Sequence, residues 1–449
     1  MTQKTSLKTR LGFGAGEFSS SIFFTVTSFW LMNFLTDEVR LSAALAGTAL
    51  LVGKIWDAVI DPFIGHFSDR TRSRWGRRRP YLLYFSIPFA IAFVLMFINP
   101  GFEAQAAKFI WVMLIYMLLC TVYSFTNIPY NALLPEMTDD YNERTSISGF
   151  KQMFAVLGTL LGAGAALPLM GLFATRTMGF TGMAAIFAIL IAISLLITFF
   201  SVRENTQKVQ PVSEKIWNSL KDVFANRPFM LLLASWFTNS TAVAIAESML
   251  IYYYKYIFQD EGAVTLAMIS LLIATILTFP LWVWLAKKIG KKAAYLIGMS
   301  LTTVTIMGIA YGADVLGLNG TLGLMVVAGI GFGSHYVLPW AMAPDTIEYD
   351  YARSGIRREG IYYSVWTFVI ALGGALAGFL VGQGLDLFGY VPDAVQTARS
   401  ITGIRLLIGP LPAVLFVLGN LAIVFYPLTR KRYEQVQAQI RERDGKKAG

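Results

Sequence analysis

The spacing of the charged residues constrains this chain more than any other feature. Eleven stretches of at least 19 residues contain no Asp, Glu, Lys or Arg. A helix needs about 20 apolar residues to cross a bilayer. These stretches cover residues 18–36, 80–102, 109–135, 152–175, 177–202, 228–246, 263–286, 293–313, 315–344, 360–385 and 406–429. A further stretch, 41–68, is equally apolar but is interrupted by Lys54, Asp57 and Asp61, so the sequence predicts an all-α membrane protein with twelve transmembrane helices.

The composition excludes several other classes of protein. Apolar residues make up 55% of the 449 residues and charged residues 14%, whereas about a quarter of an average soluble domain is charged. A transmembrane β-barrel is excluded because its strands would alternate apolar and polar residues. The single cysteine, Cys120, excludes a disulfide framework or a thiolate metal cluster. The sequence has no glycine-rich phosphate-binding loop, so transport driven by ATP hydrolysis has no support. It also has no metal-ligand motif for metal catalysis, and we expect no cofactor.

The positions of Lys and Arg predict the orientation of the chain. If both termini lie on one side, 30 basic residues fall on that side, six fall on the other, and Lys54 lies within a helix. Cytoplasmic loops carry the excess of basic residues, so both termini should be cytoplasmic. The net charge of +10 therefore follows from topology and gives no support for a nucleic-acid partner. We expect a multi-pass, monomeric plasma-membrane protein, in bacteria an inner-membrane protein.

The chain also repeats itself. The first predicted helix ends in FWLMNFLTDE and the seventh in LIYYYKYIFQDE, and the fourth and tenth end in similar pairs of prolines followed by an acid. Duplicated six-helix halves with a site between them are typical of alternating-access transporters. We predict an N-terminal half at 1–202, a cytoplasmic linker at 203–225, a C-terminal half at 226–429 and a basic tail at 430–449 that is solvated or rests on anionic headgroups.

The interrupted helix carries the clearest functional signal. Asp57 and Asp61 are four residues apart and share one helix face, and Lys54 precedes Asp57 by three residues. Two carboxylates this close in a low dielectric cannot both ionise without a cation, a proton or a basic partner. We interpret the group as a cation-coupling site. The alternative is an ion triad that only clamps this helix to a neighbour.

Two further acidic residues lie in predicted helices. Glu17 follows a glycine-rich stretch at the cytoplasmic end of the first helix, where it could equally be a hydrated carboxylate at the membrane surface. Glu247 lies deeper in the seventh helix. A charged group facing lipid is costly, so we expect Glu247 to face a central cavity.

The loop after the second helix reads GHFSDRTRSRWGRRRP. We interpret it as a conformational latch in which an aspartate caps helix ends and pairs with an arginine. Its candidate residues are Gly65, Asp69, Arg70, Arg77 and Arg78. Cytoplasmic topology alone would explain the arginines but not Gly65 or Asp69.

Four stretches carry a resemblance to a known family: KIWDAVIDPFIG (54–65), TRSRWGRRRP (71–80), NIPYNALLPEMTDDYNERT (127–145) and GIRREGIYYSVWTF (355–368). The chain resembles the major facilitator superfamily and, within it, the glycoside–pentoside–hexuronide:cation symporters, the family of the melibiose permease. The resemblance implies uptake of a sugar or glycoside driven by Na⁺, Li⁺ or H⁺. It places the cation-coupling role on Asp57 and Asp61, with Lys54 beside them and Ser124 as a hydroxyl ligand.

The sequence departs from the family at two positions. Ile60 stands where the melibiose permease has an asparagine, and isoleucine supplies no oxygen. A metal cation needs several oxygens at close range, whereas a proton needs one carboxylate. We therefore favour H⁺ as the coupling ion. Na⁺ bound by Asp57 and Asp61 is the alternative. Many members also carry a lysine where this chain has Ala371 and Leu372, so one charge of the family's cavity is absent.

The resemblance also suggests substrate contacts. Sugars need flat apolar faces beneath their C–H surfaces and polar groups that bind adjacent hydroxyls. The candidate faces are Tyr336, Trp340 and Trp366, although each aromatic could also be a packing residue. The candidate polar contacts are Glu17, Asn127, Asn131, Lys151 and Glu247.

The sequence therefore predicts a secondary active transporter that couples a cation to a sugar or glycoside. One alternative is a proton-coupled exporter of the same fold, and another is a non-transporting membrane receptor. An intramembrane enzyme would need a catalytic pair or metal ligands, and His66 and His335 offer no such set, so we predict that the chain is not an enzyme.

Overall fold

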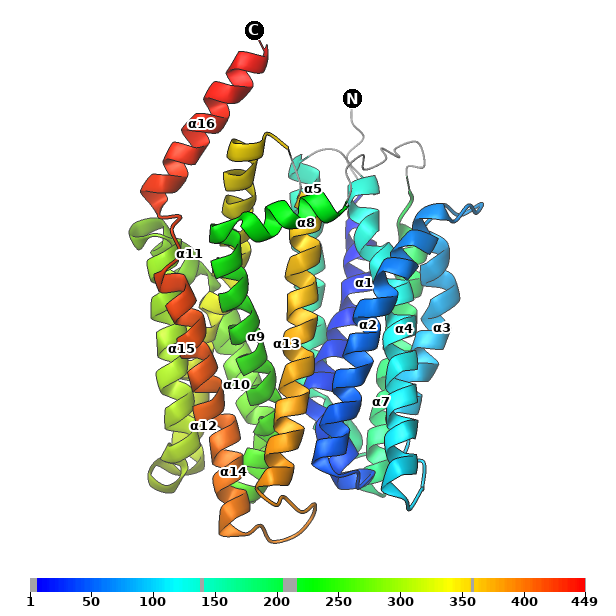
Figure 1. The fold of residues 1–449 in the computed structure, drawn as a ribbon. Coiled ribbons are helices and arrows are strands. Elements are labelled where there is room, and N and C mark those ends of the chain that lie inside the picture. Colours follow the sequence, from blue (N-terminus) through cyan, green and yellow to red (C-terminus); the bar gives the residue numbers. More distant parts are fainter. Residues whose placement is uncertain (1–5, 138–140, 205–215, 357–358, 449) are drawn as a thin grey trace. The chain divides into compact units, whose positions relative to one another are not determined.

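The protein is described here from a computed structural model that covers all residues except 1–5, 138–140, 205–215, 357–358 and 449. Within the described residues, all regular secondary structure is helical (Figure 1), which confirms the predicted all-α class. Contacts along the chain divide it into two units. Unit 1 comprises Met1–Pro211 and Gly378–Ser400, and unit 2 comprises Val212–Ala377 and Ile401–Gly449. The predicted linker and half boundaries remain predictions.

Unit 1 is built from the first seven α-helices. The elements are α1 (Leu7–Val26), the π-helical segments η1 (Thr27–Leu31) and η2 (Phe34–Glu38), α2 (Ala43–Arg70), α3 (Arg79–Met96), α4 (Gln105–Met137), α5 (Tyr141–Gly164), α6 (Ala166–Met170) and α7 (Arg176–Ser201). Helix α1 packs against α5 and α7, α2 packs against α4, and α3 packs against α4 and α7.

Glycines allow α1 and α5 to pack closely. A Cβ atom at Gly158 of α5 would lie 2.9 Å from the carbonyl oxygen of Phe18, and one at Gly162 would lie 3.0 Å from Thr25. Small residues permit such close approach where helices meet in a membrane. An aromatic core stands beside this contact, in which the Phe23 ring lies 4.6 Å from the ring of Tyr123 between their centroids.

Unit 2 contains the remaining helices. They are α8 (Ile216–Ala225), α9 (Arg227–Tyr253), the π-helical η3 (Tyr254–Phe258), α10 (Ala263–Leu277), α11 (Phe279–Ile289), α12 (Lys291–Ser354), α13 (Glu359–Leu387), α14 (Ala398–Ile408), α15 (Pro410–Val424) and α16 (Arg430–Ala448). The last part of α13 and the start of α14 group with unit 1. Helix α9 packs on α15, and α12 contacts α10, α11, α15 and α16.

The long helix α12 is folded back on itself. Gly317 has φ 63° and ψ −170°, which interrupts the helix after residue 316. A left-handed φ of this kind favours glycine. On either side of the turn the two halves run antiparallel, since a Cβ at Gly308 would touch Leu324 and one at Gly298 would lie 2.2 Å from Ser334. Helices α10 and α11 form a second bent pair, with an angle of 43°.

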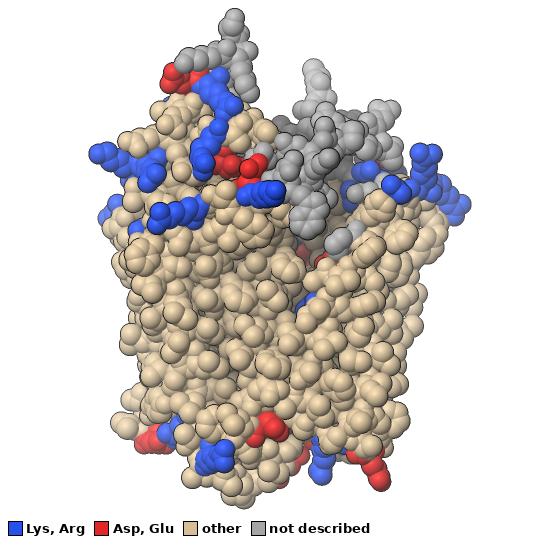
Figure 2. Space-filling view, in the orientation of Figure 1, with Lys and Arg blue, Asp and Glu red and all other residues tan. Residues whose placement is uncertain are grey.

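Apolar side chains cover the outward faces of the helices. On α7, Ile189, Ile193 and Ile197 are exposed at a spacing of four residues, and α15 exposes Val414, Val417 and Leu421 at spacings of three and four. Figure 2 shows a broad band with few charged side chains between charged groups near the helix ends. Exposed apolar stripes of this extent suit a bilayer. Eight helices of the described chain are long and apolar enough to cross a membrane, or nine with the bent pair, and the count of twelve remains a prediction.

Candidate functional site

The predicted cation-coupling residues on α2 and α4 lie together in unit 1. The Lys54 ammonium lies 3.2 Å from Oδ2 of Asp57. The Ser124 hydroxyl on α4 donates a hydrogen bond of 2.9 Å to Oδ1 of the same carboxylate. Asp57 is 7% exposed, so both oxygens of a buried carboxylate have a donor. The sequence spacing alone could place Lys54 near Asp57, but only the fold brings Ser124 to them.

Close contact between α2 and α4 creates this arrangement. A Cβ atom at Gly53 would lie 2.2 Å from the ring of Tyr116, so glycine lets the two helices approach one residue before Lys54. The indole of Trp56 donates to the Thr121 hydroxyl at 2.9 Å and fixes the register of the pair. The Lys54 ammonium also lies 5.6 Å from the ring centroid of Phe24, a cation–π contact.

Asp61 lies one helical turn beyond Asp57. Its Oδ1 atom is buried and accepts no hydrogen bond from any described residue. A buried carboxylate oxygen without a donor is costly unless it holds a proton or a cation. The described residues offer no group of three or more His, Cys, Asp or Glu side chains that could hold a metal ion. The neighbouring Ile60 contributes no oxygen.

A second polar group joins α1, α4 and α5. The Lys151 ammonium lies 3.2 Å from Oε2 of Glu17 and donates to Oδ1 of Asn131 at 2.7 Å. The Asn131 amide in turn donates to Oδ1 of Asn127 at 2.8 Å. Side chains that the sequence suggested as separate substrate contacts thus form one hydrogen-bonded chain, which we call the Glu17–Asn127 chain. Its members are partly accessible, with 27% of the Lys151 side chain and 21% of the Glu17 side chain exposed.

The glycine-rich start of α1 positions Glu17. A Cβ atom would lie 2.1 Å from Ser201 Cβ at Gly12, 2.6 Å from the Phe154 ring at Gly14 and 2.4 Å from the Tyr130 ring at Gly16. Glycine at these positions lets α1 contact α7, α5 and α4 at once. The Tyr130 hydroxyl also donates to the carbonyl oxygen of Phe13 at 2.8 Å. Close packing therefore holds Glu17 next to Lys151.

In unit 2 the predicted aromatic residues fall into two groups. Tyr336 and Trp340, on α12, are 38% and 43% exposed and could present a ring face to a ligand. Trp366, on α13, is completely buried, and its ring stacks on that of Trp236 at 4.8 Å between centroids. In this structure a sugar could not touch Trp366, which packs in the core instead. Glu247, on α9, is partly buried.

The predicted latch loop is organised around a residue that the sequence reasoning missed. The Glu204 carboxylate accepts hydrogen bonds from the backbone N–H groups of Arg77, Arg78 and Arg79 at 2.6 to 2.8 Å. Gly76 has φ 105°, and a Cβ there would lie 2.6 Å from the Glu204 carboxyl carbon. Arg77 and Arg78 thus contribute backbone groups here. Of the other latch candidates, Gly65 packs near Ile128, Arg70 is exposed, and the Asp69 side chain lies outside the described residues.

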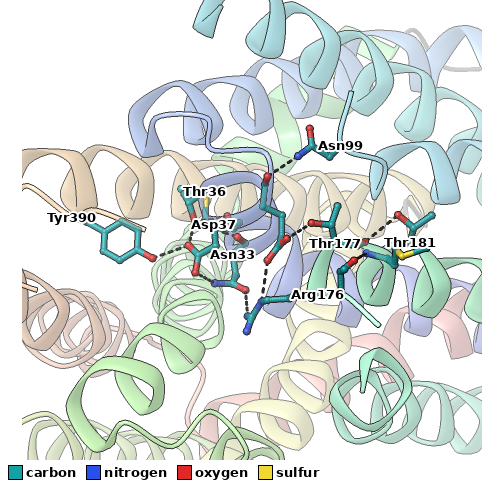
Figure 3. A network of polar contacts seen from close by, with 12 residues as sticks. Asn33, Thr36, Asp37, Asn99, Arg176, Thr177, Thr181 and Tyr390 are labelled. Carbon is teal, nitrogen blue, oxygen red and sulfur yellow. Dashed lines mark hydrogen bonds and ion pairs between the residues drawn. The ribbon is translucent and has the colours of Figure 1, made fainter. Parts of the chain in front are cut away.

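Figure 3 shows another polar cluster of unit 1, where η2 meets the chain after α13. Asp37 is 2% exposed. Its carboxylate accepts hydrogen bonds from the Tyr390 hydroxyl at 2.7 Å, the Asn33 amide at 3.0 Å and the Thr36 hydroxyl at 2.8 Å. Arg176 donates to Asn33 and pairs with Glu38. In the sequence, Asp37 and Glu38 were visible as the end of the repeated segment FWLMNFLTDE. Nothing in the sequence indicated that Tyr390 would contact Asp37.

Comparison with known proteins identifies the family. The family model for MFS/sugar transport proteins matches residues 12–430. The chain belongs to this family. It is 31% identical to the "glucuronide carrier protein homolog" of Escherichia coli (strain K12), covering 99% of this chain and 97% of that protein. It is 32% identical to the "isoprimeverose transporter" of Lactiplantibacillus pentosus, covering 94% and 88%. These names bear out the predicted glycoside–pentoside–hexuronide:cation symporter family.

Solved structures support the same fold. The crystal structure of the nucleoside transporter NupG matches with a TM-score of 0.66 at 15% identity, covering 93% of this chain and 100% of that one. A bacterial homologue of the human lysosomal transporter Spinster matches with a TM-score of 0.66 at 13% identity, covering 97% of both chains. The major facilitator fold is therefore confirmed. Since the family and its named relatives are transporters, the prediction that this MFS/sugar transport protein is not an enzyme is also confirmed.

Proposed function

We propose that this protein is a secondary active transporter that carries a sugar or glycoside across the membrane together with a cation, by alternating access, and that the cation is a proton. The coupling residues are Asp57 and Asp61, with Lys54 and Ser124 as partners of Asp57. One observation carries the proposal: within a membrane helix, Asp57 is fully partnered while Asp61, one turn away, has a buried oxygen without a donor.

The donor set favours a proton over Na⁺. The Lys54 ammonium and the Ser124 hydroxyl already engage Oδ2 and Oδ1 of Asp57. A metal cation would have to gather several oxygens in competition with these donors. A proton needs only the free oxygen of Asp61. Protonation of Asp61 would remove a charge from the membrane interior, which lowers the cost of changing the conformation around it.

The relatives named for glucuronide and isoprimeverose support a sugar or glycoside as substrate. The Glu17–Asn127 chain offers carboxylate, ammonium and amide groups suited to sugar hydroxyls. Tyr336 and Trp340 offer accessible aromatic faces, and Glu247 a further carboxylate. We propose these residues, without Trp366, as the substrate contacts.

The proposed setting is the plasma membrane, in bacteria the inner membrane. There the protein would work as a monomer with twelve transmembrane helices, and both termini would be cytoplasmic. The distribution of basic residues supports this orientation, with 30 on one side and six on the other.

Purified protein in proteoliposomes tests the proposal. Counterflow with a panel of glycosides first identifies an exchanged sugar, and it needs no ion gradient. That sugar is then added outside the vesicles without Na⁺ and at a clamped membrane potential, while a dye reports external pH. Symport with H⁺ predicts that the medium becomes alkaline. Uptake that requires Na⁺ without alkalinisation would exclude H⁺ coupling, acidification would indicate antiport, and sugar binding without exchange would indicate a receptor.

A further inference from the structure

We infer that the substrate of this transporter is an electrically neutral sugar or glycoside, and not a hexuronate or a sulfonated sugar. The inference rests on the proposed transport function and concerns the charge of the transported molecule. It follows from the partners of the basic side chains that lie far from both ends of their helix, among the described helices α1 to α15.

An anionic sugar bound within the membrane needs a basic partner. Removing a carboxylate or sulfonate from water is costly unless a positive group or several donors replace the lost hydration. Among the described helices α1 to α15, Lys54 and Lys151 are the basic side chains that lie more than two turns from either end of their helix, and Lys151 directly precedes the apolar stretch 152–175. These two residues are therefore the candidates for binding an anionic substrate.

Lys54 is already committed to another group. Its ammonium lies 3.2 Å from Asp57, and its side chain is 11% exposed. The rings of Phe23 and Phe24 flank it, at 6.0 and 5.6 Å from their centroids. A substrate anion at Lys54 would leave Asp57 as a buried carboxylate without its cation, which is strongly unfavourable.

Lys151 is compensated as well. Glu17 lies 3.2 Å from its ammonium, and Asn131 accepts a hydrogen bond of 2.7 Å from it. A uronate carboxylate could bind Lys151 only by displacing Glu17 or by lying beside it. Either arrangement places two carboxylates around one ammonium, where one of them repels the other. A hydroxyl group carries no such penalty and can donate to Glu17.

The candidate residues of unit 2 add no positive charge. Glu247 is acidic, and residues 360–385 of α13 contain no charged side chain. His335 is 4% exposed and stacks between the rings of Trp236 and Phe332, at 4.5 and 5.4 Å between centroids. It is enclosed by aromatic rings and cannot offer a positive group to a ligand. The exposed rings of Tyr336 and Trp340 suit the apolar face of a neutral pyranose.

The formal charges of the candidate residues of unit 1 summarise this balance. The carboxylates of Glu17, Asp57 and Asp61 outnumber the ammonium groups of Lys54 and Lys151. A proton on Asp61 would make the two numbers equal and would not create a positive excess. A group of residues without a positive excess does not attract anions and accepts neutral molecules rich in hydroxyl groups.

Pairs of labelled sugars that differ only at C6 test the inference. Methyl glucosides and methyl galactosides are compared in counterflow with the matching methyl uronides and with their 6-sulfonates, in proteoliposomes of the full chain. We expect exchange of at least one neutral glycoside and at least a tenfold preference for it over its anionic partners. Exchange of a uronide or sulfonate as fast as its neutral partner would overturn the inference and leave the transport function standing. Exchange of neither class would contradict the transport function, and the inference with it.

One variant gives a second, independent readout. Glu17→Gln keeps the size of the side chain but leaves the Lys151 charge without a counter-charge. We expect the ratio of uronide to neutral exchange to rise at least tenfold. Glu434→Gln is the matched control, because Glu434 pairs with Arg430 on α16 and is 65% exposed. Equal ratios in the two variants would contradict the inference. If Glu17→Gln fails to fold, the comparison on the unmodified protein decides.

Discussion

The Lys54 ammonium and the Asp57 carboxylate form an ion pair 3.2 Å apart within one membrane helix, and Ser124 from α4 completes the partners of that carboxylate. An ion pair in the membrane interior is a poor source of stability compared with apolar packing. We propose that it serves cation coupling instead. In this arrangement both oxygens of Asp57 have a donor, whereas Oδ1 of Asp61 has none among the described residues, so we propose Asp61 as the proton-binding carboxylate.

Lys54→Gln should destabilise the protein. Removal of one partner leaves a buried, uncompensated carboxylate, and breaking such a pair costs about 3–5 kcal/mol. Lys54→Gln combined with Asp57→Asn removes both charges and should recover most of the loss. Thermal unfolding in detergent of the two single variants and the double variant measures this coupling. Additive losses would show that the pair is not coupled in the folded protein.

Trp340→Ala should weaken sugar binding about two- to tenfold, the loss expected when one aromatic face worth about 0.5–1.5 kcal/mol is removed. The concentration of sugar that gives half-maximal counterflow measures the effect. Trp284→Ala is the control, since Trp284 on α11 is 51% exposed and lies 4.1 Å from the Lys288 ammonium. Equal effects of the two substitutions would remove Trp340 from the proposed substrate contacts.

Gly76→Ala should be more destabilising than Gly101→Ala. Both glycines have a positive φ, 105° and 69°, which strains any other residue. Only at Gly76 would the new Cβ collide with the Glu204 carboxylate, whereas the space around Gly101 is open. The difference between the two unfolding temperatures reports the fit between Glu204 and the backbone N–H groups of the loop. Identical unfolding temperatures would mean that the Glu204 contact does not stabilise unit 1.

Tyr390→Phe removes only the hydroxyl that donates to the buried Asp37 carboxylate. A hydrogen bond to a charged group contributes about 1.5–3 kcal/mol, so the variant should unfold at a lower temperature. Tyr84→Phe provides the control, because Tyr84 is 60% exposed. In an Asp37→Asn background the effect of Tyr390→Phe should shrink. An undiminished effect there would show that Tyr390 acts through another partner.

The sequence predicted the features that depend on spacing along one helix. Charge-free stretches indicated the membrane helices, and the i, i+3 and i+4 spacing placed Lys54, Asp57 and Asp61 on one face of α2. Ser124 came from the family resemblance, and the fold then brought it within 2.9 Å of Asp57. The periodicity of one helix shows which of its residues share a face. It does not show which residues of another helix will pack against that face.

Contacts between distant segments could not be read from the sequence. Along the sequence, Glu204 lies 125 to 127 residues from the backbone N–H groups whose hydrogen bonds it accepts. Tyr390 lies 353 residues from Asp37. Such pairs depend on how the helices pack. Burial also depends on packing: the sequence left open whether Trp366 faces a ligand or the core, and in this structure its side chain is completely buried.

The coupling role of Asp61 is the central claim, and Asp61→Asn tests it most directly. An asparagine keeps the shape of the side chain but cannot take up a proton. We measure sugar accumulation driven by a proton gradient and, in the same proteoliposomes, sugar counterflow without a gradient. The proposal predicts that accumulation is lost while counterflow continues. Accumulation at the level of the unmodified protein would contradict the assignment of coupling to Asp61.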